Sequence, residues 1–277
     1  MRTSTIAGSW YPENRRELNE LTESLLQQAE VPEISGNLFG LIAPHAGIQF
    51  SGRAAACAYK LVRGREINRV ILIGPSHYHS FHGLAVSGVD AYETPLGIVP
   101  VGQKHAAALS ALPLFSGPSD AEMPEHSLEM HLPFLQTVLP ECELLPIVTG
   151  HLSATECKNA ARELSGLIDS HTLIAASSDF THYGHRFGYV PFEDNVAEKL
   201  RDLDSGAIDR IMQKDCPAFM DYVAETGATI CGATPIALLL HMLPPESQSA
   251  LLSYYTSGDI LNDYTDTVSY ASIAFYG

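Results

Sequence analysis

The segment that decides the fold runs from Arg69 to His79 and reads Arg-Val-Ile-Leu-Ile-Gly-Pro-Ser-His-Tyr-His. Its apolar run from Val70 to Gly74 is typical of a strand buried on both faces of a parallel sheet. Pro75 cannot donate a hydrogen bond to a sheet, so the strand stops there and presents Ser76 and His77 beyond its carboxyl end. In open α/β sheets, ligands bind at that edge.

Two other segments repeat this arrangement. Apolar strands are predicted at Phe39 to Ala43 and at Thr172 to Ala176, and each runs into a polar tail that contains a histidine. If the three strands lie side by side, their tails converge on one crevice, because carboxyl ends of parallel strands share an edge. The side chains expected to meet there are His45, His77, Asp179 and His182.

The rest of the chain alternates strands with helical patterns. Leucines recur at helical spacing from Glu13 to Val31, an alanine-rich helix is predicted from Arg53 to Val62, and Ser153 with Glu156 forms a capping-box signature. No tandem repeat or linker interrupts the pattern. These features predict an α/β fold, with residues 1–277 in a single domain around a central mixed, mostly parallel sheet flanked by helices.

Some segments are harder to assign. Short strands at Leu84 to Ser87 and Ile98 to Val101 are expected to flank a turn at Tyr92 to Gly97, as an antiparallel excursion at the sheet edge. Separate helices are predicted at Asn195 to Arg201 and at Ile208 to Gln213.

Composition limits the classes of partner. The chain has 16 basic and 32 acidic residues, a formal net charge of −16, and this opposes broad affinity for nucleic acid or an anionic membrane. The 5 cysteines are scattered, without the close pairs of structural zinc sites. The first residues lack a secretory pattern, and the apolar stretch from Ile236 to Leu243 is too short to span a bilayer. We therefore predict a cytoplasmic protein in a reducing setting.

The histidines suggest a metal site. Two neutral imidazoles, from His45 and His77, plus one anionic side chain would hold a divalent metal and leave coordination positions free. Asp179 and Cys231 are both candidates for the anion, and Cys231 lies close to a predicted helix amino terminus, which favours a thiolate. His182, together with Asp179, is then predicted to carry out proton transfer.

Simpler interpretations stand beside these. A single loop histidine is more often a structural hydrogen-bonding residue, and Cys231 is by default a small buried apolar residue. Glu125 and His126 either cap a helix or form a wall of the crevice. With Ser76 and Tyr183, they are the predicted substrate-binding residues.

Several familiar motifs are absent from the sequence. It contains no glycine-rich dinucleotide or phosphate loop, no His-Glu-x-x-His pair and no Gly-x-Ser-x-Gly elbow. Nucleotide-driven chemistry is therefore not supported.

Six motifs together carry a family resemblance. They span about 230 residues in a fixed order, and such a set is far more specific than any one motif. The chain resembles the Memo family, which includes a eukaryotic protein named as a mediator of receptor-driven cell motility and prokaryotic relatives described as a component of an AmmeMemoRadiSam system. The motifs are Ala7 to Pro12, Ala43 to Gly47 with Ser51-Gly52, Gly74 to His77, Glu125 to Pro133, Ser177 to Gly184, and Cys231-Gly232.

This resemblance implies a fold similar to that of class III extradiol dioxygenases, which are non-haem iron enzymes. His45 and His77 would match two metal ligands, Cys231 would stand where the dioxygenases place a glutamate, and Asp179 with His182 would complete the pocket. Iron (Fe²⁺) is the implied cofactor. A softer cysteine ligand would move metal choice toward copper or zinc. The family is also described as binding phosphotyrosine peptides, in its eukaryotic member, in the same pocket.

Three functions follow as hypotheses. The first is a non-haem iron oxidoreductase, similar to the dioxygenases, that acts on a small molecule, such as an aromatic one. The second is a non-catalytic module that binds a peptide or small ligand in the same crevice. The third is a metal-free enzyme that uses Cys231 as nucleophile with a histidine base.

Overall fold

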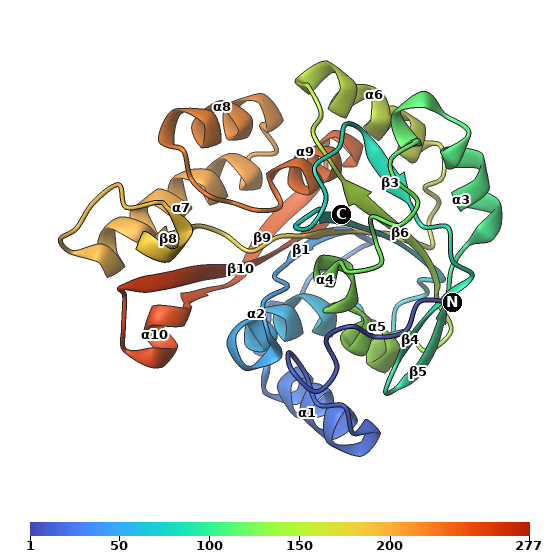
Figure 1. The fold of residues 1–277 in the computed structure, drawn as a ribbon, viewed down its shortest axis with the longest axis horizontal. Coiled ribbons are helices and arrows are strands. Elements are labelled where there is room, and N and C mark those ends of the chain that lie inside the picture. Colours follow the sequence, from blue (N-terminus) through green and yellow to red (C-terminus); the bar gives the residue numbers. More distant parts are fainter.

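The computed structural model describes residues 1–277, and its centre is an eight-stranded sheet (Figure 1). The strands of this sheet are β1 (Leu38–Ala43), β2 (Arg69–Pro75), β3 (Leu84–Val86), β6 (Glu143–Thr149), β7 (Thr172–Ser177), β8 (His182–Gly184), β9 (Gln248–Thr256) and β10 (Asp266–Tyr276). Their order is β3-β6-β2-β7-β1-β10-β8, and β9 pairs with β10. Strands β6, β2, β7 and β1 are parallel, whereas β3, β8, β9 and β10 pair antiparallel. The predicted mixed α/β sheet is confirmed.

The three strands that end in polar tails do lie side by side. Strand β7 stands between β1 and β2 and pairs in parallel with both, so that Ile174 is level with Gly40 on one side and with Ile71 on the other. Their carboxyl ends therefore share one edge of the sheet, as the sequence predicts.

Both faces of the sheet are covered, which explains why β2 is a continuous apolar run. Val70 and Leu72 face one core, Ile71 and Ile73 face the other, and all four are fully buried. Burying one such side chain contributes about 1.5–3 kcal/mol to stability. Alternating residues of one strand thus stabilise two separate layers of helices.

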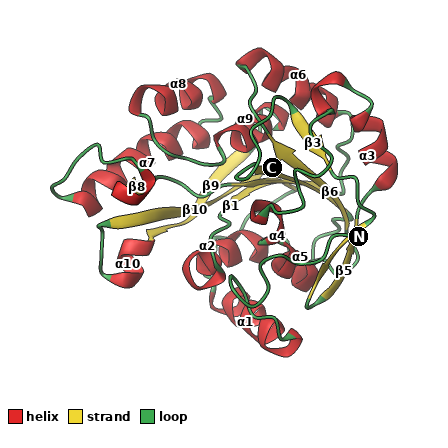
Figure 2. Cartoon of the chain, viewed as in Figure 1, coloured by secondary structure: helices red, strands yellow, loops and turns green.

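The structure has ten α-helices, and most of them pack against the two faces of the sheet (Figure 2). Helices α1, α2 and α5 contribute to the core of Val70 and Leu72, and α3, α6, α7, α8 and α9 to the core of Ile71 and Ile73. The bounds are α1 (Arg15–Gln28), α2 (Ile48–Lys60), α3 (Gln103–Ser110), α4 (His126–Glu129), α5 (Leu132–Val138), α6 (Ala154–Ser165), α7 (Val196–Met212), α8 (Cys216–Thr226), α9 (Ala233–Met242) and α10 (Ser257–Leu261). Ser153 and Glu156 form the predicted capping box at the start of α6.

Two local predictions need correction. The segment from Leu84 does not pair with the one from Ile98: β3 joins the main sheet through β6, while β4 (Ala91–Thr94) and β5 (Gly97–Pro100) form a separate two-stranded sheet. Only Pro95 and Leu96 separate β4 from β5, so the turn is tighter than expected and Tyr92 lies in a strand. Gly97, at the end of this turn, has a φ of 133°, which glycine adopts readily.

The two helices predicted between residues 195 and 213 form one helix, α7. Asp204 and Gly206 suggest a break there because both residues have low helix propensity. In the structure Asp204 is buried and accepts hydrogen bonds from Thr181 and from the Tyr254 hydroxyl, while a Cβ at Gly206 would clash with Tyr222. Tertiary contacts therefore override local preference in the middle of α7.

None of the helices combines the length and apolar character that crossing a bilayer requires.

Candidate metal centre

Three imidazole rings gather at the carboxyl edge of the sheet. His45 follows β1, His77 follows β2, and His126 begins α4, and one ligand atom from each lies within 4.8 Å of the others. Ring centroids of His77 and His126 are 4.4 Å apart, and those of His45 and His77 are 5.2 Å apart. These three histidines could hold a metal ion. His126 is thus a candidate ligand as well as a predicted substrate contact.

A glycine allows α4 to reach this edge. A Cβ at Gly74 would lie 2.6 Å from the Ser127 hydroxyl oxygen, closer than side-chain atoms can approach. That hydroxyl donates a hydrogen bond to the carbonyl of Pro75, at 2.9 Å. The Gly-Pro end of β2 therefore both stops the strand and places α4 beside His77.

Glu125 fixes the orientation of His77. Its carboxylate accepts from the backbone N–H of His77 at 2.7 Å and from Nδ1 of the ring at 2.8 Å. Burial raises the pKa of Glu125, but the hydrogen bonds and charge of His77 outweigh burial and bring it to about 2. An ionised carboxylate can only accept, so Nδ1 carries the proton and Nε2 keeps its lone pair for a metal.

Ser177, the last residue of β7, does the same for His45. Its hydroxyl donates to the carbonyl of Ser127 at 2.6 Å, so its lone pairs must accept from His45 Nδ1 at 2.6 Å and from His131 Nε2 at 2.8 Å. Nδ1 of His131 in turn accepts from the Tyr59 hydroxyl. His45 Nε2 therefore carries no proton.

The electrostatic surroundings favour the neutral form of His45, His126 and His131. Burial, followed by the charges of His77 and His126, holds the pKa of His45 well below its usual value. Burial and the charge of His77 lower the pKa of His126 to about 4, and burial lowers that of His131 to about 3. The neutral imidazole is the form that binds metals.

Cys231 lies next to Nε2 of His45, the ring nitrogen that carries no proton. Its sulfur is 3.3 Å from His45 Nε2, and the residue precedes α9, as predicted. A Cβ at Gly232 would lie 2.3 Å from Cβ of Ser178, so only glycine permits this approach. Burial and the charge of Asp179 raise the pKa of the Cys231 thiol, and the thiolate therefore needs a neighbouring cation.

Asp179 accepts hydrogen bonds from the backbone next to His45, and its predicted part in catalysis stays a prediction. Its Oδ1 accepts from the N–H groups of His45 at 2.8 Å and of Ala46 at 3.3 Å. Burial raises its pKa, and the charge of His182 opposes the shift. Asp179 thus holds the loop that carries His45.

One ring nitrogen of His182 is engaged by the backbone, and proton transfer by this residue stays a prediction. Its Nδ1 lies 3.1 Å from the carbonyl of Thr229, which can only accept a hydrogen bond. Nδ1 therefore bears the proton, and Nε2 is the basic atom. The ring also meets Phe187 edge-on, with centroids 5.2 Å apart.

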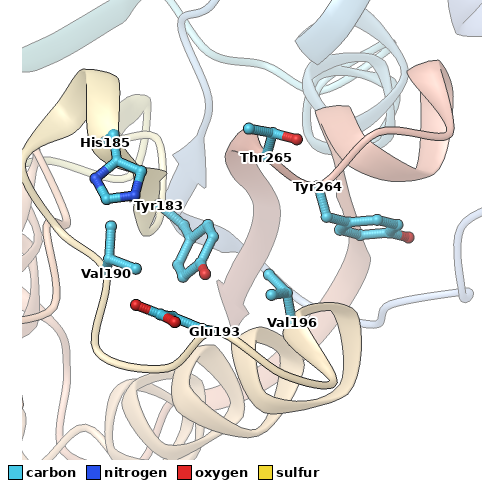
Figure 3. Close-up of a pocket in the computed structure, with 7 residues that line it drawn as sticks. All are labelled: Tyr183, His185, Val190, Glu193, Val196, Tyr264 and Thr265. Atoms are coloured by element: carbon cyan, nitrogen blue, oxygen red, sulfur yellow. The ribbon is translucent and has the colours of Figure 1, made fainter.

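Two predicted substrate contacts, Ser76 and Tyr183, make their hydrogen bonds to backbone groups and not to the histidine rings. The Ser76 hydroxyl donates to the carbonyl of His79, at 2.8 Å. Tyr183 lines a different cavity of about 370 Å³, where its ring gathers with Val190 and Glu193 (Figure 3). Substrate binding by these two residues stays a prediction.

Aromatic residues that sequence reasoning left unassigned line a cavity of about 310 Å³ beside the histidines. Its wall includes Ala46, which follows His45, Phe187, which contacts His182, and Trp10, whose ring centroid lies 4.4 Å from that of His126. Trp10 is the only tryptophan and lies in an irregular segment. These two features could have identified it as a candidate binding residue. The remaining aromatic lining residues are Phe50 and Tyr270.

We expect Ser177→Ala to lower the affinity for a metal ion about 10–100-fold, the usual effect of losing a residue that orients a ligand. The substitution removes the acceptor of the His45 Nδ1 proton, so the ring can rotate and exchange tautomers. Metal titration of the stripped protein measures the effect. Ser272→Ala is the matched control, since that serine is also buried in a strand of the sheet and its hydroxyl has no hydrogen-bond partner. Equal affinities in the two variants would contradict this role of Ser177.

Comparison with known proteins shows which family the chain resembles. Residues 2–274 match the family model described as Memo-like protein. The chain is similar to Protein MEMO1 of Danio rerio, with 34% identity over 286 residues that cover 98% of this chain and 96% of the relative. It is likewise 34% identical to a MEMO1 family protein of Thermoplasma volcanium, covering 99% of this chain and 97% of that one.

A solved structure of an uncharacterized Escherichia coli K12 protein shares the fold, with a TM-score of 0.54 and 14% identity over 86% of this chain and 99% of that one. That likeness supports the architecture alone. The family match and the relatives, in contrast, extend over nearly the whole chain. The chain therefore belongs to the Memo family.

Proposed function

We propose that this protein binds one transition-metal ion, iron in the first place, through His45, His77 and Cys231, and uses it for redox chemistry on a small aromatic molecule. The observation that carries the proposal is the set of hydrogen bonds on Nδ1 of His45 and His77, which leave both Nε2 atoms free. Metal-binding histidines are characteristically held in this way.

Cys231 is preferred over His126 as the third ligand. Its sulfur adjoins His45 Nε2, and a thiolate would balance part of the charge of the cation, which a third neutral imidazole cannot. Asp179 is less suited, because its Oδ1 already accepts two backbone hydrogen bonds. A thiolate ligand also keeps copper and zinc in consideration.

Iron at this position would supply one-electron chemistry and polarise an oxygen atom of the substrate. The chain itself contributes orientation and proton transfer. The cavity lined by Trp10 and Phe187 accommodates a planar ring beside the histidines, and His182 Nε2 accepts a proton from the substrate.

A non-catalytic binding module is the second candidate, and the aromatic cavity is the observation that favours it. Trp10, Phe50 and Tyr270 offer stacking surfaces to a peptide or small ligand whether or not turnover occurs. A metal-free cysteine enzyme has less support, because the raised pKa of Cys231 disfavours the nucleophilic thiolate.

Anaerobic purification followed by elemental analysis tests the proposal, since exclusion of air protects an iron-thiolate site from oxidation. We expect close to one iron per chain, and a change in the metal's absorption spectrum when a catechol is added. Metal-free protein that still binds the same catechol with undiminished affinity would favour the binding module.

Replacing Cys231 separates a ligand from a buried apolar residue. We expect Cys231→Ser to lower iron occupancy, because a hydroxyl stays protonated near neutral pH and donates poorly to a metal. Cys231→Asp should restore part of the occupancy by providing an anionic oxygen. Elemental analysis of folded, anaerobic protein measures both. Equal occupancy in all three proteins would exclude Cys231 and favour His126 or Asp179.

A further inference from the structure

A second cleft, of about 610 Å³, lies among α6, α8 and α9 and is separate from the histidine centre. Figure 1 shows α6 and α8 on either side of α9. The volume is typical of cavities that hold small organic molecules, about 300–1,000 Å³. None of the candidate metal ligands lines it. Nothing in the proposed redox function uses this cleft.

Positive charge concentrates on one wall. Lys158 and Arg162 are four residues apart on α6 and therefore share a face of the helix. His241, near the end of α9, lines the same space and lies close enough to Lys158 for that charge, together with burial, to lower its pKa. Asp221 is the single acidic residue in the lining.

These cations are not neutralised within the protein. The ion pairs of the structure engage Arg2, Arg16, Arg63, Arg69 and Lys199, and neither Lys158 nor Arg162 has a carboxylate within 4.0 Å. The chain has twice as many acidic as basic residues, 32 against 16. The two cations without ion-pair partners therefore make this cleft locally positive on a protein that is negative overall. A positive cleft favours an anionic ligand.

The rest of the lining is apolar or neutral. Leu152, Met220 and Ala237 present hydrocarbon, and the buried thiols of Cys157 and Cys216 stay protonated because burial raises their pKa to about 12 and about 11. Asp221 is the only carboxylate that faces this lining. An apolar body would fit against it with its charged group toward α6.

We propose that this cleft binds a small organic anion, an apolar chain or ring that carries one carboxylate group. The carboxylate lies between Lys158 and Arg162, where charge-assisted hydrogen bonds are available, and the apolar part covers Met220 and Ala237. The site is independent of the metal, so it stands whether or not the proposed redox function holds.

Calorimetric titration of the purified, metal-containing protein with three probes tests the cationic part and the apolar part of the site separately. Octanoate has the charge and the chain, acetate has only the charge, and 1-octanol has only the chain. We expect octanoate to bind at least about tenfold more tightly than either of the others, since a hydrogen bond to a charged group and apolar burial each contribute to affinity. Absence of octanoate binding, or equal binding of all three, would overturn the proposal.

Variants locate the binding. Lys158→Ala with Arg162→Ala should weaken octanoate binding at least about tenfold, whereas Lys104→Ala with Arg15→Ala, which removes two exposed, unpaired cations elsewhere, should leave it unchanged. Met220→Trp should block the cleft while metal content and the unfolding temperature stay near those of the wild type. Octanoate affinity that is the same in the first and second double variants would place the binding elsewhere and exclude this cleft.

Discussion

His77→Ala is expected to lower metal affinity by more than about a hundredfold, beyond the effect of losing a residue that only orients a ligand. The side chain is 28% exposed at the end of β2, so the fold should survive the change. Its removal also leaves the Glu125 carboxylate without its main partner. Elemental analysis of anaerobic protein, combined with circular dichroism to verify folding, measures the result.

His182→Ala is the matched control for this experiment. It removes another histidine from the same edge of the sheet, but its assigned role is proton transfer, so metal content should stay at the wild-type level while any turnover is lost. Loss of metal in His182→Ala would make this residue a ligand. Normal metal content in both His77→Ala and His45→Ala would refute the site.

Glu129→Ala is expected to have the largest effect on stability, about 3–5 kcal/mol, because it leaves the charge of Arg2 buried without its carboxylate partner. The two side chains are 2.7 Å apart and almost completely buried, with exposures of 1% and 0%. Glu129 also accepts from the Tyr11 hydroxyl, and Arg2 donates to the carbonyl of Glu125. Denaturant unfolding measures the loss of stability.

The double variant Arg2→Met with Glu129→Leu serves as the control. It removes both charges and keeps similar volume, so it should be much more stable than Glu129→Ala alone. Equal destabilisation in the two proteins would show that the charge on Arg2 is not the cause. Because this ion pair ties the N-terminal segment to α4, loosening it should also disturb the contact between Trp10 and His126.

The strand ends could be predicted because one local rule governs them. An apolar run stopped by a polar tail identifies both the strand and its exposed carboxyl end, and that was enough to bring His45 and His77 together. The position of β7 between the other two strands was not needed for this conclusion. Any parallel order of the three strands would have placed their tails at the same edge.

The parts that escaped prediction depend on contacts across long sequence separations. Ser177 is an ordinary serine in the sequence, and its role arises only because His45, His131 and Ser127 approach it from three different elements. Trp10 gives no sign of its neighbour His126. The α7 segment likewise looks like two helices until the partners of Asp204 are known.

Cys231 and His45, which face each other across the centre, are separated by 186 residues. Strand β1, which precedes His45, and the segment just before α9 must both be in place before these groups can meet, so a nascent or truncated chain that ends before Cys231 lacks the proposed third ligand. Long-range contacts of this kind form late in folding. Tight binding of a metal would therefore report that synthesis and folding of the chain have reached α9, and bound metal would in turn protect the finished fold from unfolding.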